Sequence, residues 1–213
     1  MASCAAILEL HTFDPAALKD AAREQGVTLT EILAIKGFGS GLEMAFAADA
    51  WEVAKGFDCL VWDGDWLKED SFTSFIAEFL KEPRHHGLAF RKASGKLDGF
   101  LQSWSPTGLL GRIVLVLVSD ECVEGARTEL RSYGVPEPDL DDLCLGWLSM
   151  RLTGARTVLA VGGGHTTARE AQATLRLPDM ARPRWEVLPI CRTKEGRQEP
   201  PEELLEALCE RSC

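Results

Sequence analysis

The chain has 213 residues, of which 46% are hydrophobic, and it carries a formal net charge of −10. This length and apolar content suit one large domain with its own core, so we expect a single domain over residues 1–213. The acidic balance argues against nucleic acid or an anionic membrane surface as the main partner. No apolar run reaches the roughly 20 residues of a membrane span, and the first ten residues lack the basic start of a secretory signal.

Seven cysteines are scattered along the chain without a Cys-x-x-Cys pair and without metal-ligand spacing to the four histidines. Cys59 and Cys191 lie inside apolar patterns typical of strands and are expected in the core. This usage favours a reducing compartment, so the predicted location is the cytoplasm. We expect neither a metal ion nor a cofactor.

The first half of the chain alternates between strand and helix patterns. Asp14-Pro15 predicts a helix start with Gly26 as its end, and Ser40 with Glu43 forms a capping box for a second helix. Segment 28–35 fits both a strand and a helix, and its β-branched residues favour the strand. The predicted strands are 5–11, 28–35, 58–62 and 87–92, and the predicted helices are 15–25, a helix ending at 55, and 71–81.

The second half continues this alternation after a long loop or flap at 93–112, which is rich in glycine, serine and tryptophan. Six consecutive apolar residues at 113–118 predict a central strand buried on both faces. Helices follow at 121–133 and at 140–153, the latter capped by Asp139; then come a strand over 157–161, a helix over 166–175, a strand over 185–190 and a helix over 201–211. The order predicts an α/β fold, a Rossmann-like three-layer sandwich with a mainly parallel sheet.

The most informative segment is the one in which an apolar strand runs into three glycines and then directly into a helix. Such a junction offers backbone N–H groups and the positive end of a helix dipole to an anion, and glycine lets a ligand approach closely. Glu170 follows one turn into the helix. The predicted ligand is a phosphorylated small molecule or nucleotide, and the candidate binding residues are Gly162, Gly163, Gly164, His165, Thr166 and Thr167.

Three other loops follow predicted strands, at 37–41, 63–65 and 119–121. Because the carboxyl ends of parallel strands meet at one edge of a sheet, we expect these loops to converge with 162–167. The first of them is also glycine-rich, which adds Gly39 and Ser40 to the candidate binding residues. Trp62, Trp66 and Trp104 lie in or beside this predicted site and are candidates to stack on a base.

The glycine turn resembles the SLOG superfamily, which includes the LONELY GUY-type phosphoribohydrolases that are often labelled lysine decarboxylases. The family motif is Pro-Gly-Gly-x-Gly-Thr-x-x-Glu, and Gly163, Gly164, Thr167 and Glu170 match it in register. Gly162 replaces the proline, and Thr166 replaces the third glycine. The resemblance extends over about residues 30–192, with specificity confined to this motif.

The resemblance implies hydrolysis of a nucleoside 5′-monophosphate, with Glu170 assisting departure of the base, and it implies a homodimer. Where the family has its catalytic arginine, this chain has Trp147, so Arg151 on the same predicted helix would have to substitute. The second strand end carries Asp63 and Asp65 in place of family glycines. Whether the chain is an enzyme therefore stays open.

Two alternatives to this enzyme remain. The first is a non-catalytic sensor or interaction protein that keeps the fold without the arginine. The second is a Mg²⁺-dependent phosphatase of the haloacid dehalogenase type, in which Asp63 and Asp65 follow an apolar strand as nucleophile and acid. Against this second reading, Leu67 stands where that family has a threonine.

Overall fold

A computed structural model describes residues 6–36, 45–63, 70–94, 110–161, 165–188, 190–192, 197–199 and 202–209. Its strands are β1 (Ala6–Leu10), β2 (Ile32–Lys36), β3 (Cys59–Asp63), β4 (His86–Lys92), β5 (Ile113–Val118), β6 (Thr157–Val161), β7 (Arg184–Leu188), β8 (Ile190–Arg192) and β9 (Arg197–Glu199). Its α-helices are α1 (Pro15–Glu24), α2 (Ala45–Ala54), α3 (Asp70–Phe79), α5 (Asp120–Ser132), α6 (Glu137–Thr153), α7 (His165–Leu175) and α8 (Glu202–Cys209).

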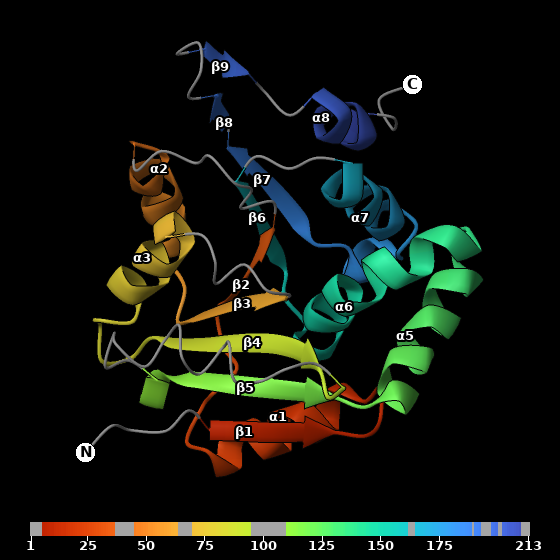
Figure 1. Cartoon of the computed structure of the whole chain (residues 1–213), viewed down its shortest axis with the longest axis horizontal. Coiled ribbons are helices and arrows are strands. Elements are labelled where there is room, and N and C mark those ends of the chain that lie inside the picture. Colours follow the sequence, from red (N-terminus) through yellow and green to blue (C-terminus); the bar gives the residue numbers. More distant parts are fainter. Residues whose placement is uncertain are drawn as a thin grey trace.

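The first seven strands form one parallel sheet in the order β1-β5-β4-β3-β2-β6-β7. Figure 1 shows α2 and α3 on one side of this sheet and α5, α6 and α7 on the other. The fold is therefore the Rossmann-like α/β fold that the alternating pattern predicts. The short hairpin of β8 and β9 is antiparallel and separate from the main sheet.

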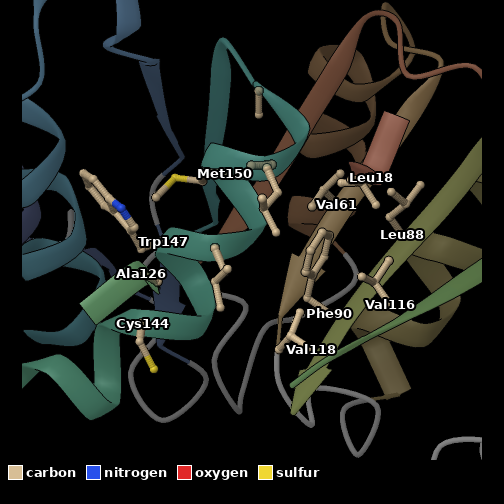
Figure 2. Packing of buried hydrophobic residues seen from close by; sticks show 14 of the residues in the cluster. Leu18, Val61, Leu88, Phe90, Val116, Val118, Ala126, Cys144, Trp147 and Met150 are labelled. Carbon is tan, nitrogen blue, oxygen red and sulfur yellow. The ribbon is translucent and has the colours of Figure 1, made fainter. Parts of the chain in front are cut away.

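The sheet divides the core into two layers, because successive strand residues point to opposite faces. On one face, Leu33, Leu60 and Leu115 pack against α2 and α3. On the other face, strand residues such as Val61 and Phe90 pack against α1, α5 and α6. Figure 2 shows this second layer, with Phe90 and its neighbours on one side and Trp147 and Met150 of α6 on the other.

Several predicted helix ends are confirmed. The Asp14 side chain accepts a hydrogen bond of 2.9 Å from the Ala16 N–H as the N-cap of α1. Gly26, Gly134 and Gly154 follow α1, α5 and α6 with φ angles of +74°, +74° and +69°, a conformation that glycine adopts at little cost. The strand predicted over 28–35 is confirmed only in its second half, because β2 spans Ile32–Lys36 and residues 28–31 precede it.

Two element predictions are wrong in detail. The helix α6 begins at Glu137 with Pro136 as its N-cap, and not after Asp139, because Pro138 is well suited to the first turn of a helix. The strand predicted over 185–190 ends at Leu188, and Ile190 belongs to the β8–β9 hairpin instead. Of the loop predicted over 93–112, residues 95–109 lie outside the described part.

Trp62 fills the core and does not face a ligand site. Its side chain is fully buried in the layer beneath α2 and α3, with an edge-on contact to Phe72 at a centroid distance of 5.8 Å. A Cβ at Gly87 would lie 2.7 Å from the Trp62 ring, so the ring requires a glycine on the neighbouring strand. The prediction that Trp62 stacks on a base is therefore wrong, while Trp66 and Trp104 lie outside the described residues.

Cys59 is fully buried in β3, as predicted, whereas the side chain of Cys191 is not described. Among the residues that the structure describes, no helix is long and apolar enough to cross a membrane.

Candidate functional site

Three charged side chains meet at the carboxyl edge of the sheet. Lys36 is the last residue of β2, Asp63 is the last residue of β3, and Glu170 lies in the second turn of α7. The Lys36 ammonium donates hydrogen bonds to the Asp63 carboxylate and, at 3.1 Å, to Glu170 Oε1. We call these three residues the Lys36 triad.

Strand alternation brings the triad together. Lys36 follows Ala34 by two residues and Asp63 follows Val61 by two residues, so both point to the face that α6 and α7 cover. There the side chains of Lys36, Asp63 and Glu170 are only 1%, 16% and 6% exposed. Charged groups at this depth are stable only when paired, which the two contacts of Lys36 provide.

The helix α6 covers the triad, and its backbone comes closest to the charged groups at Gly146. A Cβ at Gly146 would overlap the Glu170 carboxylate and would lie 2.5 Å from Lys36 Nζ and 2.9 Å from Glu170 Cδ. Only glycine at this position lets the helix backbone pass so close to the paired charges. The sequence predicted a helix here but did not reveal why its interior contains a glycine.

The triad shifts the protonation equilibria of two of its members. Burial raises the pKa of Glu170 to about 7; Lys36 opposes this rise, and the Asp63 carboxylate adds to it. Burial lowers the pKa of Lys36, but the attraction of Asp63 and Glu170 outweighs this effect, so the pKa is raised overall. Lys36 therefore stays an ammonium while Glu170 can gain or lose a proton near neutral pH, as an acid or base must.

The triad lies where the strand order of the sheet reverses. β2 and β6 are neighbours, yet the chain leaves β2 toward α2 on one face and leaves β6 toward α7 on the other. Ligands of open α/β sheets bind in the crevice that forms outside such a pair of strand ends. Because all seven strands run parallel, the carboxyl ends of β2, β3, β5 and β6 lie at this edge. Residues 37–41, 64–65 and 162–164 of the loops predicted to converge there lie outside the described residues.

The first turn of α7 is the described part of the predicted anion site. The helix begins at His165, one residue earlier than predicted, and only residues 162–164 separate it from β6. His165 and Thr166 are exposed, and His165 Nδ1 lies 3.6 Å from a Glu203 carboxylate oxygen on α8. Thr167, three residues before Glu170 on the same helix, is buried. Gly39, Ser40, Gly162, Gly163, Gly164 and Asp65 lie outside the described residues.

Arg151 and Glu170, predicted to act together, have different partners. Glu170 bonds Lys36, whereas the Arg151 guanidinium donates a hydrogen bond of 2.8 Å to Glu129 on α5. The same Glu129 carboxylate accepts a bond from the Trp147 indole. Arg169, which precedes Glu170 on α7, forms an ion pair with Asp139 of α6 and so fixes the two helices to each other.

A cavity of about 200 Å³ lies at the opposite, amino edge of the sheet. Gly154 and Ala155 before β6 and Pro183 before β7 line it, together with Trp147 of α6. Its two lining arginines are engaged, Arg151 by Glu129 and Arg156 by the Met180 carbonyl. We assign the candidate site to the Lys36 triad, because the titrating and paired groups are there and not at this mainly apolar cavity.

No protein-family model matches the sequence, and no curated protein matches it. Among solved structures, an iron-containing alcohol dehydrogenase from Corynebacterium glutamicum is similar to it with a TM-score of 0.37 and 12% identity. The match covers 67% of this chain and 48% of that one, so the chain spans about half the length of the dehydrogenase. The strand order of this chain itself defines its Rossmann-like fold.

The buried Glu170 carboxyl makes stability depend on pH. Its pKa is about 7 in the folded chain against 4.5 for an ordinary glutamate, so the folded state holds an extra proton between these pH values. The stability that this carboxyl contributes is present below pH 4.5 and is lost as the pH rises to 7. Relative to Glu170→Gln, the wild type should lose about 3 kcal/mol across this window.

Urea unfolding of the wild type and of Glu170→Gln at pH 5, 6, 7 and 8 tests this expectation. Glu206→Gln on the exposed face of α8 is the matched control and should follow the wild type at every pH. A constant difference in unfolding free energy between the wild type and Glu170→Gln would contradict the prediction.

Proposed function

We propose that this chain binds a nucleotide or another phosphorylated small molecule at the carboxyl edge of the sheet, between β2 and β6. The observation that carries the proposal is the buried Lys36 triad at the point where the strand order reverses, beneath the start of α7. The first N–H groups of α7 have no partner within the helix and favour an anion there. In the sequence, a glycine-rich segment follows both β2 and β6, which also suits an anion site.

The most concrete enzymatic form of this function is hydrolysis of a nucleoside 5′-monophosphate. Glu170 would act as the acid that protonates the departing base, for which a pKa near 7 is well suited. Lys36 would hold the carboxyl in place, as its 3.1 Å bond to Glu170 Oε1 allows. Because Glu129 engages Arg151, the proposal gives that arginine no part in the reaction.

A thermal-shift screen tests binding. The ligands are AMP, other nucleoside monophosphates, ribose 5-phosphate, ADP-ribose and Mg²⁺, each with the wild type and with Thr167→Ala. A ligand at tenfold its Kd should stabilise the wild type by about 1.4 kcal/mol, a rise in Tm of roughly 3–6 °C. Thr167→Ala should lose this rise, and Thr30→Ala, an exposed threonine before β2, should keep it.

Each result of the screen leads to a different conclusion. A shift that depends on Thr167 supports the binding site, and release of free adenine from AMP by the wild type but not by Glu170→Gln would establish the hydrolase. Binding without release of the base would favour the alternative of a non-catalytic sensor protein. A shift with Mg²⁺ alone would favour the phosphatase, although Asp63 is already bonded to Lys36. The absence of any shift would overturn the proposal and favour an interaction protein.

A further inference from the structure

The cavity of about 200 Å³ at the amino edge of the sheet, which we call the amino-edge cavity, is separate from the Lys36 triad. Its buried wall includes Trp147 and Met150 of α6, Thr174 of α7 and Leu177. The Thr174 hydroxyl donates a hydrogen bond of 2.7 Å to a carbonyl of its own helix and accepts one of 3.0 Å from the Trp185 indole. This wall therefore offers a ligand apolar contact and leaves the threonine already satisfied.

The volume and the lining of the amino-edge cavity suit a single aromatic ring. An engineered apolar cavity of about 150 Å³ takes up one benzene molecule, so about 200 Å³ has room for one ring with a small substituent. The Trp147 indole and the Met150 sulfur both make favourable contacts with aromatic rings. A ligand can enter from solvent, because the lining residues Met180 and Arg156 are exposed.

The charge of the lining favours an anionic substituent on that ring. Arg151 and Arg156 line the cavity, and no acidic residue is among the described residues that do so. Glu129 neutralises Arg151. Arg156 Nη1 donates a hydrogen bond to the Met180 carbonyl, whereas Arg156 Nε and Nη2 have no partner among the described residues. Such a pair of guanidinium nitrogens binds a carboxylate through two parallel hydrogen bonds. The negative end of the α6 dipole also lies here, at Gly154, but its partial charge is smaller than the full charge of Arg156.

We propose that the amino-edge cavity binds a small aromatic carboxylate. The ring lies against Trp147 and Met150, and the carboxylate accepts hydrogen bonds from the Nε and Nη2 groups of Arg156. This site is independent of the phosphorylated ligand proposed above, because it lies at the opposite edge of the sheet and uses none of the same side chains.

Isothermal titration of the full chain with benzoate at pH 7 tests the proposal. Benzoate has one ring and one carboxylate and should bind with a dissociation constant below about 1 mM. Benzyl alcohol has nearly the same size without the charge and should bind about tenfold more weakly. Acetate has the charge without the ring and should show no measurable binding.

Two variants separate the contribution of the apolar wall from that of the charge. Ala181→Leu fills the cavity from the short helix Asp179–Ala181 and should abolish binding of both benzoate and benzyl alcohol. Arg156→Gln should weaken benzoate binding about tenfold and leave benzyl alcohol unaffected. The matched control is Arg23→Gln, which replaces an exposed arginine of α1 and should bind benzoate like the wild type.

Three results would overturn the proposal. The first is the absence of benzoate binding to the wild type. The second is benzoate binding that Arg156→Gln leaves unchanged, and the third is equal affinity for benzoate and benzyl alcohol. If thermal unfolding shows that Ala181→Leu does not fold, Arg156→Gln still decides the outcome, because Arg156 is exposed and its replacement leaves the core intact.

Discussion

Replacement of Lys36 by methionine is expected to lower the free energy of unfolding by about 3–5 kcal/mol at pH 8, because it removes one partner from a buried set of charges. Methionine keeps the length of the side chain but leaves Asp63 and Glu170 side by side without a cation. Part of the loss should be regained at pH 5, where a carboxyl can be protonated. Denaturant unfolding followed by tryptophan fluorescence measures both effects.

A matched control and a rescue variant sharpen this test. Lys55, which follows α2, forms an exposed ion pair with Glu52, so Lys55→Met should cost no more than about 1 kcal/mol. The triple variant Lys36→Met, Asp63→Asn, Glu170→Gln removes every charge of the triad and should recover most of the stability. If Lys36→Met were as stable as Lys55→Met, the triad would not be a buried ion cluster.

The second large effect is expected for Gly146→Ala. In most helix interiors this substitution stabilises a protein by up to about 1 kcal/mol. Here the added methyl would overlap the Glu170 carboxylate and crowd Lys36, so the free energy of unfolding should fall by about 2 kcal/mol or more. Denaturant unfolding at pH 7 measures the change, with Gly56→Ala as control because only the Val53 carbonyl lies near a Cβ there, at 3.8 Å.

A double-mutant cycle shows whether the loss arises from Glu170. Glu170→Ala makes room for a methyl group at Gly146, so the combined variant Gly146→Ala, Glu170→Ala should lose much less stability than the two single variants together. Strictly additive losses would mean that the methyl disturbs something other than the triad.

The fold was predictable because its signals are local. The apolar run Ile113–Val118 could only be a strand buried on both faces, and Asp14-Pro15 with Gly26 marked both ends of α1. Alternation of strands and helices then implied a parallel sheet with a shared carboxyl edge. The start of α6 was misplaced because Asp139 is a good N-cap residue that instead pairs with Arg169.

Only part of the site was predictable. Glu170 stood out through its place after the glycine turn, whereas Lys36 was overlooked because the predicted strand ended one residue before it. A lysine that ends an apolar strand, at an edge where carboxylates converge, was the available signal. For Gly146 the signal was an isolated glycine inside a helical pattern. Arg151 is near the family position in the sequence, but nearness in sequence does not fix where a side chain points, and the Arg151 guanidinium bonds Glu129.

The wide spacing of the triad along the chain also bears on how the protein folds. Lys36 and Asp63 are 27 positions apart, whereas Lys36 and Glu170 are 134 apart. Contacts between such distant segments require closure of a long loop and tend to form late in folding. Interactions absent from the folding transition state act mainly on the rate of unfolding. We therefore expect the Lys36–Glu170 bond to slow unfolding of the native protein and to have little influence on how fast it folds.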